Sequence, residues 1–162
     1  MYGTTYNNAY DEYSNKERAK IINRRLHKND TLIILGDIGN IEYLKLLKPC
    51  YKVLILGNHD AGRTVYEDYF DEIYEGPLVI SEKIILSHEK LMIPGMLNIH
   101  GHCHDADPYN DFGSGICFNI SGNLVNFNKL NLKEVFEFGI VKRIPSIHRL
   151  AIEKQKKYKN EV

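Results

Sequence analysis

Short apolar runs that end in polar side chains recur along this chain. The four clearest runs are Thr31–Leu35, Val53–Leu56, Lys83–Leu86 and Met96–Ile99. Val53–Leu56 is short, continuous and partly β-branched, which is typical of a strand that is buried on both faces. Ligands of open α/β sheets bind beyond the carboxyl ends of such strands. The pattern therefore predicts an α/β fold with a binding site where the strands end.

Three other segments carry helix signals. Ser14 and Glu17 have the spacing of a capping box, and apolar residues follow at helical intervals as far as Leu26. A second helix is predicted over residues 41–48, between the first two strands. Because a helix joins them, these two strands should be parallel, as in a βαβ unit. Residues 62–75 have a third helical pattern that ends at a Gly-Pro pair.

The remaining segments are interpreted from turn signals and polarity. Residues 78–86 have the pattern of a β-hairpin, and residues 116–127 have that of a second hairpin. Residues 105–115 are rich in Asp, Gly and Asn and are expected to form a polar loop. Residues 132–138 are predicted to form a helix or an irregular turn, and residues 1–13 show no clear periodicity.

Composition narrows the class of protein. The length of 162 residues suggests one domain, residues 1–140, followed by a basic tail, residues 141–162, that is predicted to be helical. The net charge is zero, so charge indicates neither a nucleic-acid nor a membrane partner, although the basic tail leaves nucleic acid open. No apolar run approaches the ~18 residues of a membrane span. The three cysteines lack metal-finger spacing, and without a secretion signal they favour reduced thiols in the cytoplasm.

The polar residues at the strand ends are candidate metal ligands. They are Asp, Asn and His, the residue types that hold Mn, Fe, Ni or Zn in open, catalytic coordination. Two such metals can stabilise the attacking and leaving oxygens of a phosphoryl displacement, and Asp37 is the candidate bridge between them. His102 and His104 would share one face of an extended segment, which turns Cys103 away from them. His100 is interpreted as structural.

Four motifs resemble those of a known family. They are Gly36-Asp37, Gly57-Asn58-His59-Asp60, Ser87-His88 and Gly101-His102-Cys103-His104. In this order and spacing they are similar to the motifs of the calcineurin-like metallophosphoesterases, most closely the small single-domain bacterial and phage members. The resemblance covers about residues 14–138. It implies an α/β/β/α sandwich of two sheets flanked by helices. It also implies hydrolysis of a phosphate mono- or diester by attack of a metal-bound hydroxide.

The resemblance implies roles for individual residues. At matching positions, Asp37 would bridge two metals, and Asn58, His88 and His102 would complete the second metal site. His104 would belong to the first metal site. His59 would be a catalytic histidine that binds no metal, faces the phosphate, and protonates the leaving oxygen or stabilises the transition state.

The chain departs from the family pattern in two ways. It contains no Asp-x-His motif, which in the family ends the first strand and supplies two ligands of the first metal. We therefore expect a fold without its first strand and one firmly held divalent ion, with Mn favoured. A second ion is expected to be weak, absent, or completed by a residue such as Asp11 or Glu12. Asn40 stands where many members have the Asp that orients the catalytic His, and Asp60 is the candidate substitute.

Two functions of different classes stay open. The first is a metal-dependent phosphoesterase that acts on a phosphate-ester substrate. The alternative is a weak or inactive protein of the same fold that serves as an interaction scaffold. A third possibility is that this chain starts downstream of the natural one, so that the missing ligands lie in an absent segment. Without a first strand, the strand at 31–35 has an open edge, so either residues 1–13 or a second copy of the protein is expected to cover it.

Overall fold

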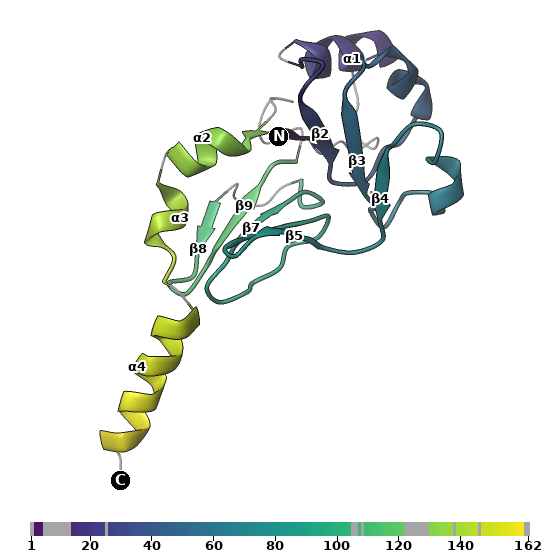
Figure 1. The fold of residues 1–162 in the computed structure, drawn as a ribbon. Helices are drawn as coiled ribbons and strands as arrows, with labels where there is room; N and C mark the ends of the chain where they lie inside the picture. Colours follow the sequence, from purple (N-terminus) through teal and green to yellow (C-terminus); the bar gives the residue numbers. More distant parts are fainter. Residues whose placement is uncertain are drawn as a thin grey trace.

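Two five-stranded β-sheets share one apolar core in this protein (Figure 1). The structure is a computed structural model. It describes residues 2–4, 14–24, 26–104, 107, 109–121, 130–137, 139–145 and 147–160.

The first sheet, sheet A, is mostly parallel. Its strand order is β10-β1-β2-β3-β4. The strands β1 to β4 run parallel to one another, and β10 pairs antiparallel with β1. Their bounds are β1 (Tyr2–Thr4), β2 (Thr31–Ile34), β3 (Tyr51–Ile55), β4 (Glu72–Tyr74) and β10 (Leu130–Asn131).

The second sheet, sheet B, has a parallel centre and antiparallel edges. Its strand order is β5-β6-β7-β9-β8. The three central strands are parallel, so the loops that follow them leave the sheet at the same edge. The bounds are β5 (Leu78–Ser81), β6 (Ile84–Ser87), β7 (Leu97–His100), β8 (Tyr109–Asp111) and β9 (Ile116–Asn119).

Helix α1 lies beside sheet A, and helices α2 and α3 lie on another side of the molecule, at the left in Figure 1. The first α-helix begins at the predicted capping box: the Ser14 hydroxyl accepts from the Glu17 amide, and the Glu17 carboxylate accepts from the Ser14 amide. The C-terminal helix α4 extends away from both sheets. The bounds are α1 (Asn15–Asn23), η2 (Ile41–Leu46), η3 (Arg63–Val65), α2 (Leu132–Glu137), α3 (Ile140–Arg143) and α4 (Ile147–Asn160).

Alternate residues of β2 and β3 face two different cores, as the pleat of a strand requires. Ile33 and Val53 belong to the core between the sheets, with β6, β7, β9 and α2. Leu32 and Leu54 belong to a second core, on the other face of sheet A. Residues from α1, η2 and the segment after η3 cover that face; they include Ile22, Leu26, Tyr43, Leu44, Tyr66 and Phe70. Sheet A is therefore buried on both faces, as its apolar runs predicted.

Several predicted elements are confirmed. Strands β2 and β3 are parallel and joined by η2, a 3₁₀ helix in the place of the predicted helix 41–48. Strands β5 and β6 form the predicted hairpin. Residues 132–137 form a helix. The strand at 116–119 is present, but it pairs with β7 and β8, and its predicted partner at 124–127 lies outside the described residues.

Two predicted segments are wrong. Residues 62–75 form a short 3₁₀ helix and then strand β4 rather than one helix. In β4, Ile73 is buried between two partly exposed residues, which is the alternation of a strand, and it pairs with Leu54 of β3. Residues 105–115 are not a loop throughout, because β8 pairs antiparallel with β9. In both places, pairing with a neighbouring strand outweighs the local pattern.

The expectation that the first strand is missing is also wrong. Strand β1 lies between β2 and β10, with Gly3 opposite Ile33 of β2 and Leu130 of β10. Three residues are too few to show a periodic pattern in the sequence. The prediction that the N-terminal segment covers the edge of β2 is confirmed for residues 2–4. Residues 5–13, including Asp11 and Glu12, lie outside the described residues.

None of the described helices has the length and apolar character needed to cross a membrane.

Deleting residues 1–4 should strongly destabilise the protein. Strands β2 and β10 would lose the backbone groups that pair with them, at about 1–3 kcal/mol for each buried group left unmet. The open edge of β2 would also favour aggregation. We expect a lower melting temperature and oligomers in size-exclusion chromatography. Deleting residues 159–162 at the other end is the control. Equal melting temperatures and a monomeric product for both deletions would contradict this prediction.

Candidate metal centre

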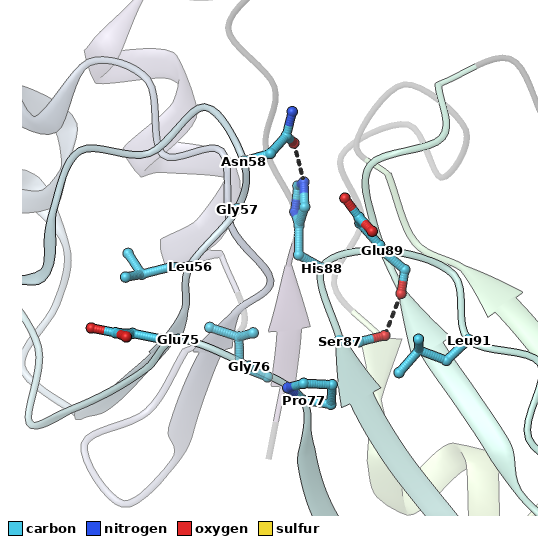
Figure 2. Close-up of a pocket in the computed structure, with 11 residues that line it drawn as sticks. Leu56, Gly57, Asn58, Glu75, Gly76, Pro77, Ser87, His88, Glu89 and Leu91 are labelled. Atoms are coloured by element: carbon cyan, nitrogen blue, oxygen red, sulfur yellow. Dashed lines mark hydrogen bonds between the residues drawn. The ribbon is translucent and has the colours of Figure 1, made fainter.

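The loops after four parallel strands converge where sheet A meets sheet B. Asp37 follows β2 and Asn58 follows β3, both from sheet A. His88 follows β6 and His102 follows β7, both from sheet B. Figure 2 shows Asn58 and His88 facing each other from opposite sides of this junction, with His88 Nε2 2.9 Å from Asn58 Oδ1. The structure thus brings together four of the residues predicted as metal ligands.

The ligand atoms of this cluster surround one point. Single ligand atoms of Asp37, His88 and His102 all lie within 4.8 Å of one another. The His88 Nε2 atom is 3.0 Å from His102 Nδ1, 2.9 Å from Asn58 Oδ1 and 3.6 Å from Asp37 Oδ2. Asp37 and His88 are only 4% and 6% exposed. Such spacing allows one cation to contact all four groups.

The hydrogen bonds around the cluster show which atoms carry lone pairs. His88 Nδ1 lies 2.8 Å from the carbonyl oxygen of Leu35. A carbonyl oxygen only accepts, so Nδ1 carries the proton and Nε2 presents a lone pair to the cluster. Asp37 Oδ1 accepts from the amide of His59, but the buried Oδ2 has no hydrogen-bond partner among the described residues.

This arrangement fits a divalent metal ion. A buried carboxylate oxygen without a partner costs free energy, and a cation beside it would offset that cost. One carboxylate, one amide oxygen and two imidazole nitrogens suit Mn, Fe, Ni or Zn better than Mg or Ca. The Leu35 carbonyl would hold the His88 ring in the tautomer that binds metal.

Two of the candidate ligands have unusual backbone conformations. Asp37 has φ 53° and His102 has φ 63°, and among the described residues they are the non-glycine residues with positive φ. The left-handed region disfavours residues with a Cβ atom, and such conformations persist where the surrounding structure enforces them. Both strained residues lie in one cluster, which points to a functional reason for the strain.

Two glycines allow the loops to approach each other. A Cβ atom on Gly36 would lie 2.6 Å from both the Gly57 nitrogen and His88 Nδ1. A Cβ atom on Gly57 would lie 2.8 Å from His88 Cε1 and would overlap Asp37 Oδ1. Any side chain at either position would therefore push apart the β2 loop, the β3 loop and the His88 ring.

Asp60 joins the loops after β2 and β3. One oxygen of its carboxylate accepts from the amides of Asp37 (2.9 Å) and Gly57 (2.8 Å). The other accepts from the Ile38 amide (2.7 Å) and from the Tyr66 hydroxyl (3.2 Å). Burial raises the pKa of the Tyr66 hydroxyl, so it keeps the proton that it donates. Asp60 therefore positions the backbone beside Asp37.

Asp60 was predicted to orient His59, the proposed catalytic histidine, but none of the contacts described for Asp60 reaches the His59 ring. The four groups that donate to the Asp60 carboxylate are three backbone amides and the Tyr66 hydroxyl. Asn40 caps helix η2, because its side-chain oxygen accepts from the Glu42 amide at 2.9 Å. Neither residue is described in contact with the His59 ring.

The other predicted residues lie around the cluster rather than in it. His59 is exposed, and its backbone amide donates to Asp37 Oδ1 at 3.2 Å, which places the residue at the rim. His104 lies outside the group formed by Asp37, His88 and His102. His100 is buried, and burial lowers its pKa, which agrees with its interpretation as a structural residue.

A cavity of about 440 Å³ adjoins the cluster (Figure 2). Asn58 and His88 line it, so it reaches the metal ligands. Its other lining residues come from the ends of β3, the β4–β5 connection and the loop after β6. They are Ile55, Leu56, Gly57, Glu75, Gly76, Pro77, Ser87, Glu89 and Leu91. Sequence reasoning missed the β4–β5 connection because β4 was interpreted as the end of a helix.

Comparisons with known proteins bear on the fold. No protein-family model matches the chain, and no curated protein matches it. Among solved structures, it is similar to a protein of unknown function from Aquifex aeolicus, with a TM-score of 0.68 and 23% sequence identity. The match covers 85% of this chain and 98% of that protein. At this identity the likeness shows a shared fold and nothing of the function.

Histidine variants should distinguish a residue that binds the metal from a residue at the rim of the site. We expect the protein to bind about one Mn²⁺ per chain in isothermal titration calorimetry. His88→Ala removes the ligand at the centre of the cluster and should weaken that binding at least about 10-fold. His59→Ala leaves the backbone bond to Asp37 in place and should bind Mn²⁺ as the unaltered protein does. Equal loss in both variants would contradict the ligand set.

Gly57→Ala should damage the site more than Gly62→Ala. The first substitution places a methyl group against Asp37 Oδ1, whereas a Cβ atom on Gly62 meets no described atom within 4 Å. We expect Gly57→Ala to lower both the melting temperature and Mn²⁺ affinity. Gly62→Ala should leave affinity unchanged and the free energy of unfolding within about 1 kcal/mol of its original value. Two variants with the same affinity for Mn²⁺ would count against the close approach of the loops.

Proposed function

We propose that this protein is a metal-dependent phosphoesterase of the metallophosphoesterase type, which hydrolyses phosphate mono- or diesters. The observation that supports the proposal best is the buried Asp37 Oδ2 atom, which has no hydrogen-bond partner in the described part of the chain and lies 3.6 Å from His88 Nε2. His102 and Asn58 complete the ligand set. These residues stand in the four motifs that resemble the family, and the two sheets with a shared core suit its sandwich fold.

The chemistry assigns different tasks to the ligands and to the rim. A divalent metal, with Mn favoured, supplies an activated water and neutralises developing negative charge when it is bound. Asp37, Asn58, His88 and His102 would hold it. His59 protonates the leaving oxygen as the bond from phosphorus to that oxygen breaks and the bond to the water oxygen forms. Its exposed side chain and its bond to Asp37 suit a group that meets substrate at the rim.

The cavity beside Asn58 and His88 is the proposed place for the organic part of the ester. Its walls include the apolar residues Ile55, Pro77 and Leu91. Its lining residues include two glutamates and, among the described residues, no lysine or arginine. A small, uncharged or cationic alcohol fits these walls better than a polyanion such as a nucleic acid.

The alternative function, an interaction scaffold with weak or no catalysis, is supported by the limited ligand set. The described cluster contains ligands for one ion, and His104 lies outside it.

We propose that the protein works in a reducing compartment, the cytoplasm, because Cys50, Cys103 and Cys117 are free thiols.

Hydrolysis of an artificial ester tests the proposal. With Mn²⁺ bound, we expect the protein to release nitrophenol from bis-p-nitrophenyl phosphate or p-nitrophenyl phosphate. His59→Ala should lower kcat roughly 10²-fold, the usual scale for the loss of a general acid, without loss of metal. His27→Ala is the matched control, because His27 is an exposed histidine that contacts Asp30 and belongs to none of the four motifs. A protein that binds Mn²⁺ but hydrolyses neither ester would favour the scaffold.

A further inference from the structure

The face of sheet B that points away from the shared core carries two buried asparagines. Asn98 on β7 and Asn119 on β9 are both 1% exposed. Asn98 lies opposite Ile85 of β6, and Asn119 lies opposite His100 of β7. Each asparagine is therefore beside the strand that precedes a histidine of the cluster: His88 follows β6, and His102 follows β7.

Asn98 holds the backbone before and after His88 in place. Its Oδ1 atom accepts from the Leu91 amide at 2.7 Å. Its Nδ2 atom donates to the Ser87 hydroxyl at 2.7 Å, and that hydroxyl donates to the Glu89 carbonyl at 2.5 Å. These bonds join the residues before and after His88 to the neighbouring strand, so the loop has little freedom to move its imidazole.

Asn119 holds the turn that contains His102. Its Nδ2 atom donates to the Cys103 carbonyl at 2.5 Å, and its Oδ1 atom accepts from the Ser121 amide at 3.0 Å. The Cys103 amide donates to the Gly101 carbonyl at 2.8 Å across His102, whose φ is 63°. A three-residue turn with a positive φ at its centre is the rare, strained form of the γ-turn. A strained turn needs outside contacts to persist, and Asn119 supplies one.

A further bond couples the two loops. The Gly101 amide donates to the His88 carbonyl at 2.9 Å, so the backbone on one side of His102 is fixed to His88 itself. The two rings also meet edge to face, with centroids 4.9 Å apart. A shift of either loop therefore changes the distance between the two imidazole nitrogens that face the cluster.

Packing alone does not explain amides at these two positions. A buried amide is stable only where both its donor and its acceptor are satisfied, and an apolar residue would avoid that demand. Asn98 meets it through Ser87 and Leu91, on either side of His88. Asn119 meets it by donating to Cys103, beside His102, and by accepting from the Ser121 amide. Groups that orient ligands in this way commonly change metal affinity 10- to 100-fold when they are removed.

We propose that Asn98 and Asn119 are positioning residues for the metal site, Asn98 for His88 and Asn119 for His102. This inference rests on the proposed function, because it requires that the cluster binds metal. Each asparagine acts from the strand next to the one that carries its histidine. The site thus depends on the pairing of β6, β7 and β9, as well as on the ligands themselves.

Metal titration of variants tests the inference. Asn98→Ala and Asn119→Ala should raise the Kd for Mn²⁺ roughly 10- to 100-fold in isothermal titration calorimetry. Asn119→Asp keeps the size of the side chain and its bond from Ser121, but it loses the donor to Cys103; it serves if the alanine variant does not fold. Ile99→Val, a buried change on the other face of β7, is the control for a general loss of stability.

Histidine spectra distinguish positioning from a loss of stability. In long-range ¹H–¹⁵N spectra of the protein with Zn²⁺, Asn119 variants should shift the His102 ring signals more than those of His88. Asn98→Ala should show the reverse pattern. Ile99→Val should leave both rings and the Kd unchanged.

Two results would overturn the inference, and they differ. If the unaltered protein binds Mn²⁺ and the asparagine variants bind it equally well, or no worse than Ile99→Val, the positioning role is wrong and the proposed metal site stands. If the unaltered protein binds neither Mn²⁺ nor Zn²⁺, the proposed function fails and the inference fails with it.

Discussion

The carboxylate of Asp60 joins the two loops on which the site is built. By accepting from the amides of Asp37, Ile38 and Gly57, it fixes the carboxyl ends of β2 and β3 relative to each other. Hydrogen bonds from several donors to one carboxylate are among the stronger contacts in a protein. They help to hold Asp37 in a left-handed conformation that it would not adopt alone. Without these hydrogen bonds, the backbone at Asp37 would be free to turn its buried carboxylate oxygen away from His88.

The site also depends on how the sheets pack. Asp37 and Asn58 come from sheet A, whereas His88 and His102 come from sheet B. The apolar core between the sheets brings the two pairs together, and its residues, such as Ile33 and Leu86, lie on the strands that precede the ligands. An ion held by all four would be a cross-link between the sheets. Since the ion would bind the folded chain only, its binding would add to the stability of the packed sheets.

The polar groups of the site form an inner set and an outer set that differ in how far their hydrogen bonds are satisfied. In the cluster itself, acceptor atoms of Asp37, Asn58 and His88 lie close together, and Asp37 Oδ2 has no hydrogen-bond partner among the residues that the structure describes. One layer further out, the side chains of Asp60, Asn98 and Asn119 have their hydrogen-bonding groups satisfied by backbone groups and by the hydroxyls of Tyr66 and Ser87. A satisfied outer layer can keep an unsatisfied centre in place, because the strain and desolvation of the centre are offset by bonds and packing elsewhere. This is the arrangement expected of a site preorganised for a ligand.

Local pattern and chemistry made part of this protein predictable from its sequence. The apolar runs predicted four strands with polar residues at their ends, and Ser14 with Glu17 predicted the capping box. The family resemblance implied Asp37, Asn58, His88, His102 and His104 as metal ligands, and the structure brings the first four together. Which short segments pair, and which polar groups meet, depends on the tertiary structure. Strand β1 and strand β4 exist through their neighbours, and the roles of Asp60, Asn98 and Asn119 depend on loops that lie far away in the chain or across a strand. Periodicity reports how one segment is buried; it carries no information on contacts between segments, which arise only when the two sheets close on their shared core.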